Sequence, residues 1–541
     1  MKLKYTGLLA IAAGLLLGSC KKPQQIFNNP YANAKAPLAI VTDPQQIPVP
    51  ATGAPGTEVT ITATGLQTYY TQGRLKFLFN GQEAKIKTVT AGGIVVIVPN
   101  SASSGITAFV VDGQLVFGPR FTVLGKVNLD PTYNNPTGAN GFVVKAFPIP
   151  NTTQMLIMGN FTNYNNAGTV VRTNRLVRVF ADGSWDRSLQ IGTGVNATVY
   201  DVAQVGAYYY VVGDFSQYAQ QSGTVQRIAK VQTNGLIDTM LVTTYLQKTK
   251  YVPTFNTGFA GGSVTSVHAV GSNKMIVSGN FTFRTTRNYA ANTYDAKDST
   301  IVDSTSVIQL AQLNVDGTLD SNWRFDKAKA GYKGHIGASL AGANGPIGPT
   351  IMDANNKLLV YGRFTSFDGQ PANTMIRLNV SDGTKDGSFN IGSGPDQTYI
   401  NLVNYNAVVN KYIVVGAFNT FNGKPSQYIA QLNYDGSVDA GFVPRVFNGG
   451  VPNFAKILDD GLVVVGGNFR SYDGVIRNGF CVLNSTGALA DLYNNTGNVS
   501  GTISDIYETK SADNKRALLI MGSFSLFDNE PKNNIVRVTF E

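Results

Sequence analysis

The chain has 541 residues and a formal net charge of +10, yet only 14% of its residues are Asp, Glu, Lys or Arg, against roughly 25% in an average globular protein. Hydrophobic residues make up 43% of the chain, which excludes disorder, and the absence of a Gly-X-Y period excludes a collagen-like chain. Two cysteines and two histidines are too few for a disulfide framework or a zinc site. Lys and Arg are scattered without any basic block, so no nucleic-acid partner is predicted.

Residues 1–19 have the features of a signal peptide. Two lysines precede an apolar run at 8–17 that is too short to span a membrane. The run ends in Leu-Gly-Ser-Cys at 17–20, which resembles the bacterial lipobox, a motif whose cysteine is acylated. That resemblance implies a lipid anchor at Cys20, since several acyl chains bind a bilayer firmly. An ordinary secretory signal with an incidental cysteine is the alternative.

A tether and a small β unit are predicted next. Residues 20–37 are rich in Pro, Asn, Lys and Gln and lack apolar periodicity, which is typical of a flexible tether. Residues 38–124 alternate apolar and polar positions in short runs, which predicts a β-sandwich. This unit resembles the immunoglobulin-like IPT/TIG family in a series of short motifs: Gly56–Ile61, Gly65–Leu66, Phe79–Gly81, Val98–Pro99 and Gly105–Ile106. The resemblance implies a spacer or interaction module.

A repeat organises residues 125–541. An apolar strand ending in Gly-x-Phe recurs with a mean spacing of about 60 residues, at seven glycines: Gly159, Gly213, Gly279, Gly362, Gly416, Gly467 and Gly522. Asp-Gly and Asn-Gly turns lie between these markers and predict antiparallel hairpins. Repeated all-strand units of this size are typical of propeller blades. The pattern resembles the delta-sixty repeat family of bacterial β-propellers.

The two ends of the repeat region complement each other. The last unit stops at 535–541 without the Asp-aromatic tail of the other units, and a matching tail occurs at Asp130–Asn134. We therefore predict an all-β chain in which an Ig-like sandwich precedes a seven-bladed β-propeller. The propeller would be closed by its own N- and C-terminal strands, which leaves no open sheet edge.

The sequence shows no motif for catalysis or cofactor binding. It contains no nucleophile elbow, phosphate-binding loop or metal-binding His pair. The repeated Asp-Gly pairs resemble part of a calcium loop but lack its first Asp and its final Glu, so we interpret them as hairpin turns. In the same way, Gly-x-Phe is interpreted as a packing device and Cys481 as a buried, inert thiol. No metal, cofactor or catalytic residue is predicted.

Two repeat units are longer than the others and carry the candidate binding residues. Two intervals between Gly-x-Phe glycines are 66 and 83 residues, whereas the other four are 51 to 55. The extra length lies in 241–262, 284–306 and 326–350, and insertions of this kind project as loops that often bind ligands or partners. The side chains that we predict to bind a ligand or a partner there are Tyr251, Tyr289, Tyr294, Trp323, Tyr332 and His335.

The order of signal, Ig-like unit and repeat propeller resembles lipoproteins of the Bacteroidetes type. That resemblance implies a lipid-anchored outer-membrane protein of the cell surface that accompanies SusC/SusD-like transporters. Its function would be non-enzymatic: an accessory subunit that binds or retains an oligosaccharide or oligopeptide. The alternatives are a propeller enzyme acting on polysaccharide and an adhesion or scaffolding lipoprotein, because sequence alone does not reveal a through-space pair of carboxylates.

Overall fold

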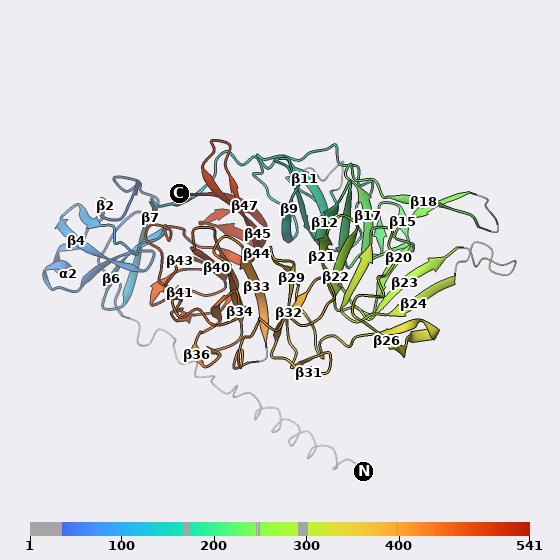
Figure 1. Cartoon of the computed structure of the whole chain (residues 1–541). Coiled ribbons are helices and arrows are strands. Elements are labelled where there is room, and N and C mark those ends of the chain that lie inside the picture. The colour runs from blue at the N-terminus through green and yellow to red at the C-terminus, as the bar shows by residue number, and fades with distance from the viewer. Residues whose placement is uncertain (1–34, 166–172, 245, 247–248, 290–300, 398) are drawn as a thin grey trace, which may run out of the picture.

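The computed structural model describes residues 35–165, 173–244, 246, 249–289, 301–397 and 399–541 (Figure 1). About 50% of the chain is in strands and 2% in helices, which confirms the all-β prediction. The signal segment, Cys20 and Tyr294 lie outside the described residues.

The N-terminal unit is one seven-stranded sheet in the strand order β1-β7-β6-β3-β4-β5-β2. The first residues of β4 pair with β3 and its last residues pair with β5, so the sheet turns at this strand and encloses one core. Alternate residues fill that core, for example Val59 and Ile61. Its elements are β1 (Thr52–Gly53), β2 (Glu58–Thr62), the helix α2 (Gln67–Thr71), β3 (Leu75–Phe79), β4 (Gln82–Thr90), β5 (Gly93–Ile97), β6 (Gly105–Val111) and β7 (Gln114–Val123).

Of the antiparallel sheets that follow among the described residues, seven are named here A to G in chain order. Sheet A is β9 (Val143–Pro148), β10 (Met155–Gly159) and β11 (Leu176–Val179); B is β12 (Val199–Val205), β13 (Tyr208–Gly213) and β17 (Ile228–Gln232); C is β21 (Val264–Val270), β22 (Lys274–Gly279) and β25 (Leu310–Asn314); D is β28 (Ile351–Met352), β29 (Lys357–Tyr361) and β32 (Met375–Asn379); E is β33 (Ile400–Asn406), β34 (Lys411–Gly416) and β37 (Ile429–Asn433); F is β39 (Pro452–Ile457), β40 (Val463–Gly467) and β43 (Phe480–Leu483); G is β44 (Ser500–Lys510), β45 (Arg516–Phe527), β47 (Ile535–Phe540) and β8 (Val127–Leu129), with β46 (Glu530–Pro531) at its side.

Each sheet packs against the next through a hydrophobic cluster of its own. Successive side chains of a strand point to opposite faces, so a middle strand serves two clusters. In β34, Tyr412 and Val414 pack toward sheet D, whereas Ile413 and Val415 pack toward sheet F. The same arrangement continues from sheet A to sheet G, and one further cluster joins sheet G to sheet A. Cys481 is fully buried in the cluster between E and F, and burial raises the pKa of its thiol to about 12.

The glycine of each Gly-x-Phe marker lies where no side chain fits. A Cβ atom at any of the seven glycines would come within 2.0 to 2.4 Å of a backbone carbonyl oxygen. For Gly522 this oxygen lies on β44, and for the other six it lies in the segment that leads into the first, innermost strand of the same sheet. In six of the sheets this innermost strand carries a β-bulge at or beside the residue that pairs with the glycine. A bulge leaves one extra residue unpaired and redirects it. These six extra residues are Val144, Tyr200, Thr265, Asn401, Asn453 and Ser504.

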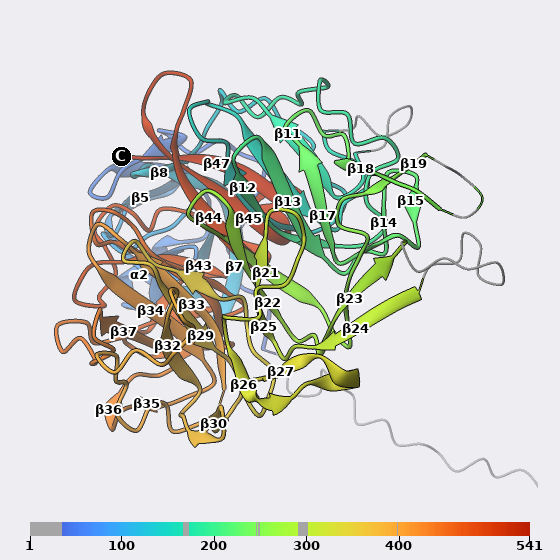
Figure 2. The ribbon, with the colours of Figure 1, turned by 45° about the vertical axis from the view of Figure 1, so that its right-hand side comes forward.

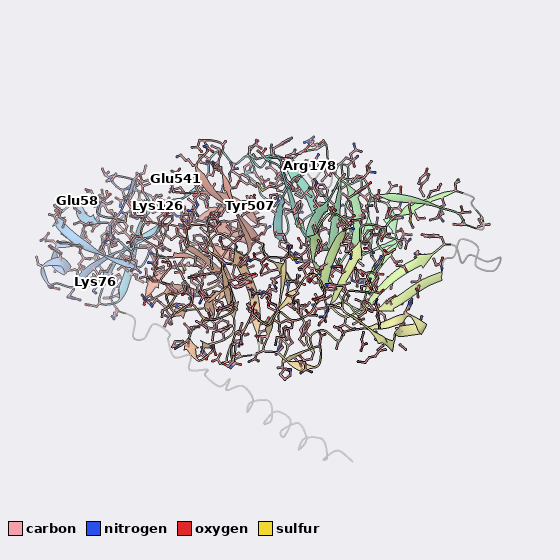
Figure 3. The ribbon with its side chains drawn as sticks, viewed as in Figure 1. Glu58, Lys76, Lys126, Arg178, Tyr507 and Glu541 are labelled. Carbon is pink, nitrogen blue, oxygen red and sulfur yellow. The ribbon has the colours of Figure 1, made fainter. Side chains whose placement is uncertain are left out.

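Sheet G contains strands from both ends of the repeat region. β8 pairs with β47, and next to that pairing the Arg537 Nε donates to Asp130 Oδ2 at 2.5 Å. Both charged side chains are 1% exposed, and Arg537 also donates to the Ala181 carbonyl beside sheet A. Lys126 and Glu541, neighbours in Figure 3, are joined by a backbone hydrogen bond of 3.0 Å. Two segments some 400 residues apart in the chain are therefore held together.

The N-terminal unit sits against sheets F and G. The buried Asn495 side chain donates to the Val123 carbonyl at 3.4 Å, and the Asn495 backbone carbonyl accepts from Ser104 N at 2.9 Å. Asn529 donates to the Ser104 carbonyl at 3.1 Å, and both Arg477 Nη atoms donate to the Ser101 carbonyl at 3.2 Å. The unit is thus attached by several hydrogen bonds besides its covalent link.

The inserted segments form hairpins at the end of the molecule remote from the N-terminal unit (Figures 1 and 2). They are β18 (Thr239–Val242) with β19 (Lys250–Pro253), β23 (Phe283–Asn288) with β24 (Ile301–Ser306), and β26 (Phe325–Ala330) with β27 (Ile336–Ser339), the last pair joined through the 3-10 turn η2 (Tyr332–Gly334). β20 (Thr257–Ala260) pairs with β23 and with β16 (Val225–Gln226). Shorter pairs lie at the sheet edges: β14 (Gln217–Tyr218) with β15 (Gln221–Ser222), β30 (Ser366–Phe367) with β31 (Gln370–Pro371), β35 (Thr420–Phe421) with β36 (Lys424–Pro425), and β41 (Ser471–Tyr472) with β38 (Phe447–Asn448) and β42 (Val475–Ile476).

Candidate functional sites

The hairpins expose apolar side chains, which we call the hairpin surface. Tyr251 on β19 is 71% exposed and Tyr332 in η2 is 44% exposed. The surface consists of Leu241, Leu246, Tyr251, Val302 and Tyr332, all of which are exposed. Large apolar side chains that gather on projecting elements are typical of sites where proteins meet partners.

Two of the predicted residues join the second and third hairpins. The Tyr332 ring packs on the Phe283 ring, with centroids 5.3 Å apart. His335 Nε2 lies 3.1 Å from Asp303 Oδ1, so an imidazole meets a carboxylate there. Aromatic pairs of this kind contribute roughly 0.5–1.5 kcal/mol, and they hold the two hairpins in one arrangement.

Two other predicted residues belong to the core. Trp323 is 2% exposed within the cluster between sheets C and D, and its Nε1 donates to the Val380 carbonyl at 2.9 Å. Tyr289 is 7% exposed. Both were expected on the binding surface, but the chain turns them inward because each large ring gains more by burial than by exposure. They are therefore assigned to packing.

A second site, which sequence reasoning missed, lies where the innermost strands meet. This central cavity has a volume of about 360 Å³. Four of the six bulge residues line it, namely Val144, Tyr200, Thr265 and Ser504. Bulges often redirect side chains beside functional sites, so the glycine markers also determine what faces this cavity.

Charged residues line one side of the central cavity. Lys145 Nζ lies 2.6 Å from Asp201 Oδ1, and Asp505 Oδ1 lies 3.4 Å from Lys456 Nζ. Burial disfavours the charged form of Lys145, but the attraction of Asp201 outweighs burial and raises the pKa of Lys145. Ser504 Oγ donates to the Val143 carbonyl at 2.6 Å, which fixes the strand that carries Asp505 against the strand that carries Lys145.

The other side of the cavity is mainly apolar. It is formed by Pro349, Ile351, Leu402 and Val403 from sheets D and E and the segment before them. Thr350, on the same side, accepts or donates in hydrogen bonds to His268 Nε2 at 2.9 Å and to Ser278 Oγ at 2.7 Å. The cavity thus has a charged side and an apolar side.

The repeated aspartates are structural, as the turn interpretation predicts. Asp382 and Asp435 each accept hydrogen bonds from the backbone N–H and the hydroxyl of the residue two positions later. Asp386 accepts the same pair from Ser388 and binds Arg377 Nε at 2.8 Å. Burial opposes its charge, but these bonds lower the pKa of Asp386 to about 2. Within the described ranges, no group of three or more His, Cys, Asp or Glu side chains is placed to hold a metal ion.

Two family models match parts of the chain. Residues 16–119 match a domain of unknown function, DUF5008, and this range overlaps the unit that resembles the IPT/TIG family. Residues 354–389 and 410–442 match a domain of unknown function described as a beta-propeller, DUF5122. These segments lie in sheets D and E, so this part of the repeat region matches a β-propeller family. No protein of curated function matches the chain.

Several solved structures are similar over most of the chain. One is described as an auxiliary nutrient binding protein from Bacteroides thetaiotaomicron VPI-5482, with 10% identity, a TM-score of 0.35 and coverage of 92% of this chain and 98% of that one. Another, with the same description, is from Bacteroides ovatus ATCC 8483, with 12% identity, a TM-score of 0.29 and coverage of 92% and 99%. A third, from Bacteroides thetaiotaomicron VPI-5482, is described as of unknown function, with 11% identity, a TM-score of 0.29 and coverage of 93% and 100%. In the part of the chain that the structure describes, no helix is long and apolar enough to cross a membrane.

Proposed function

We propose that this protein is a non-enzymatic surface lipoprotein, anchored in the outer membrane at Cys20. It acts as an accessory subunit of a SusC/SusD-like uptake complex and retains an oligosaccharide or oligopeptide there. The hairpin surface carries the proposal, because it presents exposed apolar side chains at the end remote from the N-terminal unit (Figure 1). A chain tethered through that unit presents the opposite end to a neighbouring protein.

The hairpin surface is suited to docking rather than to catalysis. Its exposed side chains are apolar, and interface cores are enriched in aromatic residues and depleted in acidic ones. The pair of His335 with Asp303 is part of the contact between two hairpins. We therefore assign the surface to a protein partner and not to a reaction.

Capture from detergent-solubilised membranes tests the docking. The double variant Tyr251→Ser/Tyr332→Ser should lose its SusC/SusD-like partner, because two anchors of an interface core are removed. The matched control is Tyr399→Ser, since Tyr399 is also 44% exposed but lies outside the hairpins. Recovery of the double variant with the partner still bound, or of the parent chain without it, would overturn the proposal.

The anchor has its own test. Cys20→Ala should release the protein from membranes and abolish labelling by a radioactive fatty acid, because the acylated sulfur is lost. Continued labelling of this variant would contradict the assignment.

We also propose that sheets A to G are the blades of one closed seven-bladed propeller and that the N-terminal unit is an Ig-like sandwich. Seven clusters that each join two consecutive sheets, and the pairing of β8 with β47, support the closed ring. An experimental structure with an eighth blade, or with a gap between sheets A and G, would contradict it.

A further inference from the structure

We propose that the central cavity binds a zwitterionic ligand with an apolar side chain, namely a free α-amino acid of the leucine type. This inference goes beyond the docking function and does not depend on it, because the cavity and the hairpin surface share no residue.

The balance of charges in the cavity disfavours a ligand with a net charge, positive or negative. Two charged side chains line the cavity, the cation Lys145 and the anion Asp505. Their ion-pair partners, Asp201 and Lys456, are not part of the lining, and the formal charges of the two pairs cancel. A ligand with a net charge would leave an unbalanced charge among partly buried groups, which is unfavourable. A zwitterion adds one charge of each sign and preserves the balance.

Two of these groups have unused capacity for a ligand. The ammonium of Lys145 has three donors, and one carboxylate oxygen, Asp201 Oδ1, lies 2.6 Å from it. Asp505 Oδ1 accepts from Ile506 N at 2.8 Å, whereas its Oδ2 accepts no hydrogen bond from any described residue. A ligand carboxylate can therefore bind Lys145 while a ligand ammonium binds Asp505. Hydrogen bonds between charged partners are about twice as strong as neutral ones.

The two groups are near enough to serve one ligand. They lie on β9 and β44, strands of the neighbouring sheets A and G that Ser504 Oγ joins by its 2.6 Å hydrogen bond to the Val143 carbonyl. Asp505 is also close enough to act on the charge of Lys145. The α-carboxylate and α-ammonium of an amino acid are held two bonds apart, which suits a pair of neighbouring strands.

The apolar side of the cavity indicates which kind of side chain the bound amino acid has. Ile351 belongs to sheet D, and Leu402 and Val403 belong to sheet E; neither sheet adjoins A or G. An apolar side chain gains free energy against this wall, whereas the hydroxyl groups of a sugar would lose hydrogen bonds there. The volume of about 360 Å³ is at the lower end of ligand pockets, which span roughly 300 to 1,000 Å³. One small molecule fits better than an oligomer.

Calorimetric titration of the purified full chain with L-leucine tests the proposal. Leucine should bind, and leucinamide and 4-methylpentanoate, which lack the carboxylate or the amine, should each bind at least tenfold more weakly. D-glucose should not bind. Absence of leucine binding, binding of either analogue as tight as that of leucine, or binding of glucose in place of leucine would overturn the proposal.

Variants then locate the site. Asp505→Asn should weaken leucine binding at least tenfold, and Ser504→Phe should abolish it by filling the cavity. Asp513→Asn is the matched control, because Asp513 lies in the exposed turn of the same β44–β45 hairpin. The two cavity variants should still capture the docking partner, so this test and that of the proposed function give separate answers. Leucine binding that survives both cavity variants would place the site elsewhere and overturn the proposal.

Discussion

Sheets D to F and sheets B and C differ in the length of the segments that connect their strands, although both groups pack through the same kind of hydrophobic cluster. Between sheets D and F the Gly-x-Phe glycines are 54 and 51 residues apart, whereas the intervals that follow Gly213 and Gly279 are 66 and 83 residues. The extra residues leave the packing between sheets unchanged in kind and extend outward as hairpins (Figure 2). Stability therefore resides in the sheets, and the hairpins are free to serve another purpose.

The largest effect should come from the bond that joins the two ends of the sheet assembly. Arg537→Met leaves Asp130 buried without its charge partner, and such losses cost about 3–5 kcal/mol. Urea unfolding of the parent chain and of Arg537→Met measures this loss as a difference in the free energy of unfolding. The exposed pair of Arg74 and Asp112 provides the control, since exposed ion pairs contribute little to stability and Arg74→Met should cost much less than Arg537→Met. Equal costs for both variants would contradict the assignment of stability to the sheets.

The free energy of unfolding should depend on pH through a contact between sheet C, which has an inserted hairpin, and sheet D, which has none. His268 of sheet C binds Thr350 beside sheet D, and burial lowers the pKa of His268 to about 4. In the unfolded chain the imidazole of His268 becomes protonated below about pH 6.5, whereas in the folded chain it becomes protonated only near pH 4. The contribution of neutral His268 to the free energy of unfolding is therefore fully present above pH 6.5. It falls by roughly 2–3 kcal/mol as the pH drops to 4. His268→Gln should flatten this part of the urea-unfolding profile; an unchanged slope would exclude His268 as its source.

A smaller loss should follow from adding one methyl group in a regular sheet. In Gly416→Ala the new Cβ would lie 2.4 Å from the Tyr399 carbonyl oxygen, and overpacking of this kind costs about 1–3 kcal/mol. Gly387→Ala has open space at its Cβ and should leave the midpoint of thermal unfolding within a degree or two. If both variants behave alike, the close approach at the Gly-x-Phe glycine is not what requires glycine there.

The smallest effect on stability should come from the hairpins. Tyr251→Ser/Tyr332→Ser alters exposed side chains and should change the free energy of unfolding by about 0.5 kcal/mol or less per site. Loss of partner capture without loss of stability would sharpen the contrast between sheets and hairpins. A large destabilisation would show that the hairpins also support the sheets.

Local rules predicted the repeated features of the fold. The Asp-Gly turns and the Gly-x-Phe glycines depend on backbone geometry within one sheet, and residues close in sequence determine that geometry. The insertion that follows Trp323 predicts that its side chain lies on the binding surface, but the position of this side chain depends on Val380, 57 residues away. The central cavity brings together residues from Val144 to Asp505, so it can be recognised only once the strand register is known. The signal that was available is the glycine itself, since the bulge lies opposite it.

The bulge residues that line the central cavity are different from the residues that form the hydrophobic clusters between sheets. None of the six bulge residues belongs to the buried hydrophobic clusters, and each is turned away from its sheet by the extra backbone unit. In evolutionary terms, substitutions at these positions can alter the chemistry of the cavity one side chain at a time while the interfaces between sheets stay intact. A lineage carrying this fold can therefore diversify its ligands without first acquiring compensating mutations in the core.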